Sequence, residues 1–406
     1  MANFDKVKKA IDEKNFNPFI PDYINLSSYK KNGGYEIANK IKNGVISKKQ
    51  VLDSLNESGL KGKGGAGFPT GKKWEIVSNY NGKKYVAVNG DEGEPGTFKD
   101  RSYLESDPHR FLEGALIASY FINAHKVYIY MRDEYPAVIK ILLDEINKME
   151  DEEIIPRDFF IVRRGAGAYI CGEESAMIES IEGKRGLPRH RPPYVAEIGL
   201  FGCPTLTNNL ETLFWVRDII EKGAKWFAEK GSNGNKGFHS FSVSGRVKNP
   251  GVKVAPAGIT IQQLIDKYCD GMADGHTFKG YLPGGASGGI LPATMNDIPL
   301  DYGSKELMDA GCFLGSAAVV VLSDHDNMKD VALNLLKFFE EESCGQCTPC
   351  RSGTEKTVKL MQEKNWNKDK LKDLSEVMAQ ASICGLGQAA TNPLNSVLKY
   401  FSNEIT

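Results

Sequence analysis

The stretch KKYVAVNGDEGEPGTFKDR, Lys83–Arg101, joins a short apolar run to an acidic, glycine-containing loop. The run YVAV is bounded by lysines and by a glycine, which predicts a buried β-strand. The loop then places Asn89, Asp91, Glu92 and Glu94 at the carboxyl end of that strand. Ligands of open α/β sheets bind at this end. The stretch therefore predicts both an α/β fold and the position of a binding site.

Two further strands alternate with helices along the next part of the chain. The strands are expected at Lys126–Arg132 and Arg157–Arg164, and the helices at Glu105–Asn123 and Tyr135–Met149. Strands that alternate with helices are typical of a parallel sheet. We therefore predict an α/β region that extends to about residue 230.

The pattern changes after the Gly/Asn-rich segment Glu229–Gly237. Short strands and turns follow it, with one helix at Thr260–Cys269, which predicts a small α+β domain. From Asn327 to the end the chain is expected to be helical, and helical periodicity is also found at Lys31–Ile41. We therefore divide the chain into an N-terminal helical segment (1–60), an α/β domain (61–234), a small α+β domain (235–326) and a helical bundle (327–406).

Composition excludes several classes of protein. The net charge of the 406-residue chain is −1, which argues against a nucleic-acid-binding surface. The most apolar run, Phe313–Leu322, is shorter than the roughly 18 residues needed to cross a bilayer, and it is expected to be a buried strand. The first residues, Met1–Asn15, contain no apolar signal-peptide core. A cytoplasmic location with no membrane span is expected.

Three of the eight cysteines lie in SCGQCTPCRSG, Ser343–Gly353. Cys344, Cys347 and Cys350 have C-x2-C-x2-C spacing, which is typical of [4Fe–4S] ligation with a remote fourth thiolate. Cys384, in the glycine-flanked sequence SICGLG, is the expected fourth ligand.

Two alternatives remain for this cysteine cluster. A zinc site with four cysteine ligands usually pairs two C-x2-4-C motifs, and here the second half is a single cysteine. Free thiols are the other alternative. The remaining cysteines, Cys171, Cys203, Cys269 and Cys312, are expected to be small buried hydrophobic residues.

A glycine-rich loop occupies GLKGKGGAGFPTGKKW, Gly59–Trp74. Gly62, Gly64 and Gly67 match the G-x-G-x-x-G spacing of dinucleotide-binding loops, but a predicted helix precedes them where that motif requires a strand. Exposed N–H groups in such a loop suit a phosphate or a flat ring, and Lys72 and Lys73 could add positive charge. The alternatives are a tight surface turn and a solvated helix start.

Two more polar segments could belong to the same site. In RRGAGAYICGEES, Tyr169, Glu173 and Glu174 follow a predicted strand, although the glutamates could simply stabilise the first turn of a helix. In PTLTNNLET, Asn208, Asn209 and Thr212 could bind a ring edge or a phosphate, or could cap a helix.

The proline-containing segment RHRPPYV adds a basic Arg191 and an aromatic Tyr194. Its adjacent prolines suit a rigid loop or the lip of a binding site. Each of these loops is ambiguous alone. Together with an iron–sulfur cluster they indicate an electron-transfer flavoprotein.

The chain resembles the flavin-binding, NADH-oxidising subunits of respiratory complex I and of soluble NAD-linked oxidoreductases. The resemblance covers nearly the whole chain and rests on GKGGAGFPTGKKW, NGDEGEPGTFKDR, GAGAYICGEE, TNNLET, ESCGQCTPCRSG and SICGLG, in that order. Within this family, three sequences look most similar to the diaphorase (beta) subunit of NAD-dependent formate dehydrogenases, namely Arg189–Ile219, Tyr281–Tyr302 and Gly311–Asp324.

The resemblance implies a Rossmann-like FMN domain, a β-grasp (SLBB) domain and a helical bundle that binds a [4Fe–4S] cluster. It implies that FMN is held by the glycine loop and by polar residues of the other segments, namely Gly62, Gly64, Gly65, Lys73, Asn89, Asp91, Glu92, Tyr169, Gly172, Glu173, Asn208, Asn209 and Thr212. It further implies that NAD(H) is contacted by Phe68, Glu94, Glu174, Arg191 and Tyr194.

The resemblance has departures. Ile76 stands where relatives often carry phenylalanine, and Arg191 replaces a lysine common in complex I. The chain also lacks the cysteines of the thioredoxin-like [2Fe–2S] domain that many formate-dehydrogenase relatives carry. That cluster is therefore expected on a partner chain.

The implied activity is reversible hydride transfer between NAD(H) and FMN, followed by single-electron transfer through the [4Fe–4S] cluster to partner subunits. No side chain is expected to act as a catalytic nucleophile. The partners would be a thioredoxin-like [2Fe–2S] subunit and a larger iron–sulfur, molybdopterin or complex I-type subunit. Alternatives are the flavin subunit of complex I or of a bifurcating hydrogenase, a subunit that docks on Rnf-type membrane partners, and a non-catalytic electron-relay subunit.

Overall fold

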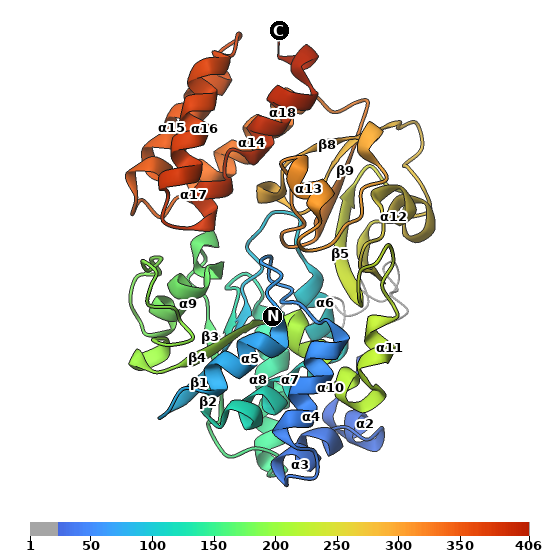
Figure 1. Ribbon diagram of the computed structural model, residues 1–406, viewed down its shortest axis with the longest axis vertical. Helices are drawn as coiled ribbons and strands as arrows, with labels where there is room; N and C mark the ends of the chain where they lie inside the picture. The colour runs from blue at the N-terminus through green and yellow to red at the C-terminus, as the bar shows by residue number, and fades with distance from the viewer. Residues whose placement is uncertain (1–22, 406) are drawn as a thin grey trace.

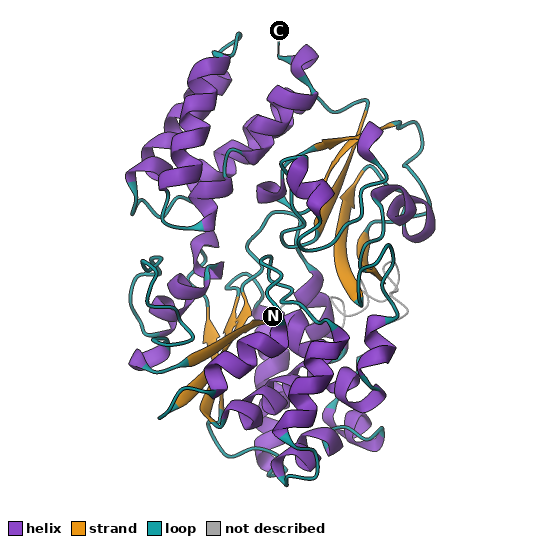
Figure 2. Ribbon diagram, viewed as in Figure 1, coloured by secondary structure: helices purple, strands orange, loops and turns teal. Residues whose placement is uncertain are grey.

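The computed structural model describes residues 23–405. The expectation about Met1–Asn15, and residues 1–22 of the predicted N-terminal segment, lie outside the described residues. Figure 1 shows an α/β region at the bottom, a second sheet at the upper right and a helical bundle at the upper left. The two separate sheets are drawn in orange in Figure 2.

The first sheet is parallel, as the alternating pattern predicted. Its strands are β1 (Lys84–Gly90), β2 (Ala124–Met131), β3 (Phe160–Arg164) and β4 (Thr205–Asn209), in the spatial order β3-β2-β1-β4. Asn89 of β1 lies beside Tyr130 of β2 and beside Asn209 of β4. The carboxyl ends of all four strands therefore share one edge of the sheet.

Alternate residues of the strands face two different cores, as the two-residue period of a strand requires. Val86 and Val88 pack against helices such as α7 and α10, whereas Tyr85 and Ala87 pack on the opposite face, where α9 lies. The helices of this region are α2 (Leu26–Lys31), α3 (Glu36–Lys42), α4 (Lys48–Ser58), α5 (Thr70–Ser78), α6 (Lys99–Ser106), α7 (Pro108–Ile122), α8 (Pro136–Asp151), α9 (Glu174–Ile181), α10 (Leu210–Lys222) and α11 (Ala224–Ala228).

Three expectations about local structure were wrong. The sequence TLTNN is strand β4, although its polar residues had been interpreted only as binding groups or caps. The helix expected from Glu105 begins at Pro108, because Asp107 caps it and the preceding turn belongs to α6. Helical structure is not continuous from Lys31, because Tyr35 adopts a left-handed backbone conformation with φ of 65°.

A buried glutamate fastens the N-terminal segment to the α/β domain. Glu145 of α8 accepts hydrogen bonds from the Tyr23 hydroxyl (2.7 Å) and from the Leu26 N–H (3.2 Å), and its other partners are His109 (2.8 Å) and Lys148 (2.7 Å). Burial alone would raise the pKa of Glu145. The hydrogen bonds outweigh burial and lower the pKa to about 2.

This carboxylate should make stability pH-dependent. Its folded pKa lies below its unfolded value, so the stabilisation is present above about pH 4.5 and is lost as the pH falls towards 2. We expect the free energy of unfolding to fall by about 3 kcal/mol over this range because of Glu145. Denaturant unfolding of Glu145→Gln should lack this slope, whereas Asp144→Asn, an exposed carboxylate of the same helix, should keep it. An unchanged slope in Glu145→Gln would contradict the assignment.

The second sheet forms a small β-grasp domain. Its strands β5 (Phe238–Gly245), β6 (Gly251–Pro256), β7 (Phe278–Leu282), β8 (Leu291–Pro292) and β9 (Ala318–Ser323) lie in the order β6-β5-β9-β7-β8. The pairing of β5 with β9 is parallel and the others are antiparallel. Helices α12 (Ile261–Tyr268) and α13 (Lys305–Asp309) complete the domain. The apolar run at Phe313–Leu322 includes β9, which is buried as expected.

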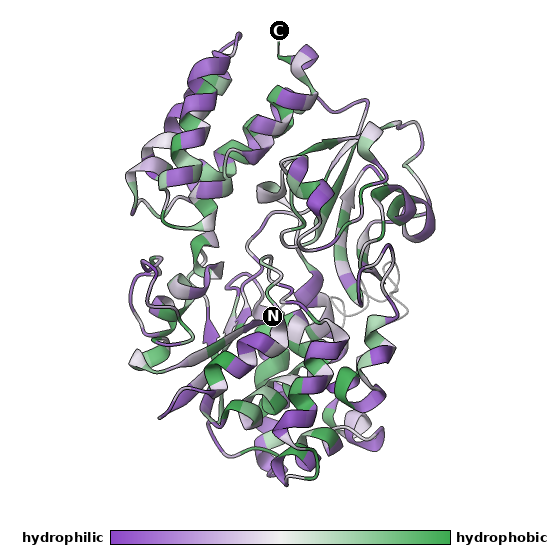
Figure 3. Cartoon of the chain, viewed as in Figure 1, coloured by the Kyte–Doolittle hydropathy of each residue, from purple (hydrophilic) through white to green (hydrophobic). Residues whose placement is uncertain are grey.

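The C-terminal bundle consists of α14 (Met328–Glu341), α15 (Thr348–Gln362), α16 (Lys368–Ala381), α17 (Gly385–Ala389) and α18 (Asn392–Tyr400). Purple and green alternate along these helices in Figure 3, as expected for amphipathic helices with one buried face. Leu336, Leu371 and Leu394 form part of their shared core. Among residues 23–405, no helix has both the length and the apolar character needed to cross a membrane.

Candidate functional site

A cavity of about 560 Å³ lies at the carboxyl edge of the parallel sheet. The loop that follows β1 forms one wall, and the segment that precedes α9 forms another. Ten of the predicted cofactor-binding residues line it, namely Gly64, Gly65, Asn89, Asp91, Glu92, Glu94, Tyr169, Gly172, Glu173 and Asn209. The structure therefore brings together residues from separate sequence motifs.

Residues that the sequence patterns did not suggest complete the cavity. Ser287, Phe313, Gly315 and Ser316 come from the β-grasp domain, and Gly385, Leu386, Gln388, Ala389 and Asn392 come from the bundle. Lys63, Thr97, Lys99 and Asp100 also line it, although the motifs that contain them had suggested other residues. Glycines were the sequence signal for both distant walls: those of the β-grasp segment indicated turns, and those beside Cys384 indicated the iron–sulfur cluster.

The glycine loop is a tight turn that is closed by a backbone bridge. Lys61 pairs with Pro69, and the Gly62 N–H donates to the Phe68 carbonyl at 2.8 Å. Gly65 and Gly67 have φ of +119° and +63°, which side-chain-bearing residues rarely adopt. The N–H groups expected to face a ligand therefore belong to a loop whose backbone conformation requires glycine at these two positions.

Glu94 connects the β1 loop to two other parts of the molecule. Its carboxylate accepts from the Tyr169 hydroxyl at 2.5 Å and from the N–H and hydroxyl of Ser287 at 2.8 and 2.7 Å. Burial raises the pKa of Glu94, and these hydrogen bonds oppose the rise. Glu94 thus links the loop of the α/β domain to the η1 turn (Tyr169–Gly172) and to the β-grasp domain beside the cavity.

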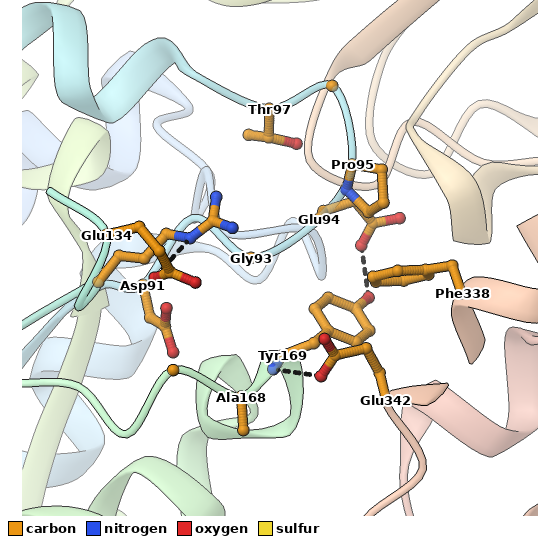
Figure 4. Close-up of a pocket in the computed structure, with 13 residues that line it drawn as sticks. Asp91, Gly93, Glu94, Pro95, Thr97, Glu134, Ala168, Tyr169, Phe338 and Glu342 are labelled. Atoms are coloured by element: carbon orange, nitrogen blue, oxygen red, sulfur yellow. Dashed lines mark hydrogen bonds and ion pairs between the residues drawn. The ribbon is translucent and has the colours of Figure 1, made fainter. Parts of the chain in front are cut away.

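A second cavity, of about 370 Å³, lies on the other side of the β1 loop. Figure 4 shows Tyr169 between two carboxylates, with its hydroxyl directed to Glu94 and its N–H to Glu342 of the bundle. Asp91 lines both cavities. Among residues 23–405 one of its carboxylate oxygens, Oδ2, is buried without a hydrogen-bond partner, and burial raises the pKa of Asp91 to about 7.

An ion-pair cluster surrounds the start of α9. Arg191 pairs with Glu173 and lies 3.3 Å from Glu174, which also receives Lys73 at 3.2 Å. Burial would raise the pKa of Glu174, but the charges of Lys73 and Arg191 outweigh burial and lower it. Glu173 also accepts from the Ser175 and Ala176 N–H groups, so it caps α9, which was the alternative interpretation of this residue.

Several predicted residues do not line the large cavity. Lys73 and Glu174 are engaged in the cluster described above, and Gly62 lies within the loop turn. Asn208 accepts from the buried Trp74 indole at 2.9 Å, and Thr212 accepts from the Lys63 N–H at 2.9 Å. Asn208 and Thr212 therefore stabilise the elements around the cavity through internal hydrogen bonds.

Three apolar side chains from the motifs of the resemblance are exposed to solvent. Phe68 is 43% exposed, Tyr194 is 57% exposed and Ile76 is 36% exposed. They are available to a flat ligand, because each offers apolar surface to solvent. Phe68 ends the glycine loop, and Ile76 lies on α5 immediately after it.

The four predicted cluster cysteines converge at the ends of α15 and α17. Cys347 directly precedes α15, Cys350 lies in its first turn and Cys384 directly precedes α17. Burial, together with the neighbouring thiols of Cys347, Cys384 and Cys344, raises the pKa of Cys350 to about 11. The N–H groups of Leu386 and Gly387 hydrogen-bond to the Cys384 sulfur. Such donors suit an iron–sulfur ligand.

The spacing of these sulfurs differs from that of a zinc site with four thiolate ligands. A tetrahedral zinc site with four thiolates and Zn–S bonds of about 2.3 Å brings its sulfurs to about 3.8 Å from one another. Within the described part of the chain, no three of these four sulfurs all lie within 4.8 Å of one another.

Two curated relatives match almost the full length of the chain. The F 2 subunit of the NADH-quinone oxidoreductase of Rhizobium meliloti (strain 1021) is 39% identical over 95% of this chain and 94% of its own length. The F subunit of the NADH-quinone oxidoreductase of Aquifex aeolicus (strain VF5) is 39% identical over 100% of this chain and 97% of its own. The chain belongs to the family of NADH-quinone oxidoreductase F subunits.

Family models and a solved structure agree with this membership. Residues 55–218 match the Nuo51 FMN-binding domain, and residues 330–406 match the NADH-ubiquinone oxidoreductase-F iron-sulfur binding region. An NAD+-reducing [NiFe]-hydrogenase in its H2-reduced state is 32% identical with a TM-score of 0.84, over 95% of this chain. This chain spans 66% of that hydrogenase chain.

Membership in this family confirms the implied enzyme class and cofactors: the chain is an NADH dehydrogenase subunit with FMN and a [4Fe–4S] cluster. The described residues fit both groups. Asp91 lines the large cavity, and within residues 23–405 its buried Oδ2 has no hydrogen-bond partner, so the site holds an unsatisfied polar atom. Gly64 lets the glycine loop lie close to Asn209 in the wall of this cavity, because a Cβ at position 64 would lie only 3.2 Å from the Cβ of Asn209.

Proposed function

We propose that NADH is oxidised at the 560 Å³ cavity and that electrons leave through Cys384. When bound there, FMN would supply the ability to accept two electrons as a hydride and to release them one at a time. One observation carries this proposal: Gly385 and Leu386 line the cavity and directly follow Cys384. The flavin cavity and the cluster ligands thus share one wall.

In this proposal the residues that line the cavity hold FMN. The glycine loop offers N–H groups to the phosphate or ring, and Asn89, Asp91 and Asn209 offer polar groups to the ribityl chain or ring edge. Glu173 and Tyr169 close the side that faces the bundle. Gly62, Lys73, Asn208 and Thr212 act by holding these elements, as their internal contacts suggest.

The dinucleotide would lie across the exposed apolar side chains. Phe68 would stack on adenine, and Tyr194 and Arg191 would line the entrance. Glu94 and Glu174 would accept hydrogen bonds from ribose hydroxyls or from the carboxamide, a role that does not require positive charge. Glu94 beside a ribose would disfavour the 2′-phosphate of NADP.

Replacing Phe68 with alanine should weaken NADH binding. Stacking on a base is worth about 1–3 kcal/mol, so we expect the KM for NADH to rise about tenfold or more in a ferricyanide-reduction assay. FMN content should not change, because the Phe68 side chain does not line the cavity. Val45→Ala, which removes a 70% exposed apolar side chain from elsewhere, is the control. An unaltered KM would exclude Phe68 from the NADH site.

A non-catalytic electron-relay subunit is the competing function. The Ile76 departure favours it, since one aromatic partner for adenine is missing. NADH:ferricyanide activity of the isolated FMN- and cluster-loaded chain distinguishes the two. A chain whose flavin band does not bleach with NADH would be a relay.

We further propose that the chain works in the cytoplasm within an NAD-dependent formate dehydrogenase. The support is the likeness of its Arg189–Ile219 and Tyr281–Tyr302 sequences to that diaphorase subunit. The quinone-oxidoreductase relatives and the hydrogenase favour the alternatives, complex I or an NAD-reducing hydrogenase. Partner subunits that co-purify from native extract decide: a molybdopterin subunit supports formate dehydrogenase, and quinone-module subunits support complex I. A thioredoxin-like [2Fe–2S] partner is expected in each case.

A further inference from the structure

Three potential metal ligands meet at one end of the β-grasp sheet. His276 lies just before β7, and Asp324 and His325 lie just after β9. These strands are antiparallel, with Phe278 beside Ser323, so the start of one and the end of the other share an edge. Each of the three side chains contributes one potential ligand atom, and these three atoms all lie within 4.8 Å of one another.

The hydroxyl of Ser323 contacts the ring of His276 and the backbone N–H of His325. It bonds to Nδ1 of His276 at 2.9 Å, accepts from the His325 N–H at 3.2 Å and lies 3.3 Å from an Asp326 carboxylate oxygen. A hydroxyl has one proton to donate, and the Asp326 carboxylate can only accept. The Ser323 hydroxyl therefore donates its proton to the Asp326 carboxylate and accepts a hydrogen bond from Nδ1–H of His276. In this tautomer Nε2 of His276 keeps a lone pair for a metal ion.

Asp324 is held by backbone hydrogen bonds, and no lysine or arginine of the described part of the chain forms an ion pair with it. Its Oδ1 accepts from the Thr277 N–H at 2.9 Å, and its own N–H donates to the Thr277 carbonyl at 3.0 Å. The nearby cations have other partners: Arg246 pairs with Asp326, and Lys279 pairs with Glu404. The two imidazole rings beside this carboxylate lie 4.6 Å apart.

We propose that His276, Asp324 and His325 form a binding site for a divalent transition-metal ion of the zinc class. Two imidazoles and one carboxylate favour Zn²⁺, Fe²⁺, Ni²⁺ or Cu²⁺ over Mg²⁺ and Ca²⁺, which prefer oxygen ligands alone. Hydrogen-bonded orientation of a ligating histidine through its other nitrogen is the usual arrangement at such sites. Asp324 and His325 are exposed, so the remaining coordination positions are open to water or to a ligand from another chain.

The test uses Zn²⁺ alone with the full-length chain loaded with FMN and its iron–sulfur cluster, so that the cluster cysteines are occupied. Equilibrium dialysis should find one Zn²⁺ per chain. His276→Ala and His325→Ala should each weaken binding at least tenfold, and Ser323→Ala should weaken it about 10- to 100-fold through lost orientation. The control is His125→Ala, which removes an exposed histidine of β2 and should bind as the parent does.

A second measurement avoids any loss of folding in the variants. In the unmutated chain, Zn²⁺ should shift the imidazole ¹⁵N signals of His276 and His325 and leave those of the other four histidines in place. Wild-type affinity in all variants, or Zn²⁺-induced shifts confined to other histidines, would overturn the proposal.

Discussion

Replacing Cys384 with alanine should yield a chain that retains FMN but contains almost no bound iron. Cys384 is the proposed ligand most distant in sequence, and the packing of α17 against α15 brings it to the other three cysteines. Removing it also removes the sulfur to which the Leu386 and Gly387 N–H groups bond. The cluster signal in electron paramagnetic resonance should disappear, while flavin absorbance remains.

Cys203→Ala is the matched control for this substitution. Cys203 is also a partly buried free thiol, but it lies in the loop between η2 (Leu200–Gly202) and β4, away from the cysteine motif. Its iron and flavin contents should equal those of the parent. Full iron content in Cys384→Ala would mean that another residue supplies the fourth ligand.

Replacing Gly67 with alanine should displace the glycine loop and release FMN. Gly67 has a φ of +63°, and a Cβ there would lie 2.4 Å from the Cβ of Tyr302, a buried residue of the β-grasp domain. The left-handed backbone costs about 1–2 kcal/mol for alanine, and the overlap adds about 1–3 kcal/mol. We expect a loss of about 2–5 kcal/mol in the free energy of unfolding and a large drop in FMN content, measured by flavin fluorescence.

Gly82→Ala separates backbone strain from the overlap. Gly82 has a similar φ of +85°, but a Cβ there would meet nothing within 4 Å. Gly82→Ala should therefore lower the free energy of unfolding by only about 1–2 kcal/mol and leave the FMN content unchanged. If both variants retain FMN equally well, contact between the loop and Tyr302 does not shape the flavin site.

Local patterns were sufficient for much of the fold. β1 and β2 are continuous apolar runs bounded by turn residues, so periodicity and composition identify them. Strand β4 was not predicted because its sequence, TLTNN, is mostly polar. Its polar side chains form hydrogen bonds inside the protein, as the bond from the Trp74 indole to Asn208 shows. Burial of hydrogen-bonded polar groups leaves no local signal.

The site divides in the same way. Asn89 and Asp91 could be predicted because a strand end places them, and Cys344, Cys347 and Cys350 because their spacing is itself the signal. Phe313 and Asn392 could not, since they reach the cavity through packing between domains. Glu94 was expected near a ligand, but its bonds to Tyr169 and Ser287 depend on three segments meeting.

The sequence by itself determined the class of the protein, the order of its binding motifs and the spacing of Cys344, Cys347 and Cys350, because these depend on residue types at short spacing. The tertiary structure alone decided which of those motifs share a cavity and that Cys384 stands beside its wall. It also decided that His276 meets His325 across antiparallel strands. Such contacts arise from the packing of remote elements, which no local pattern records.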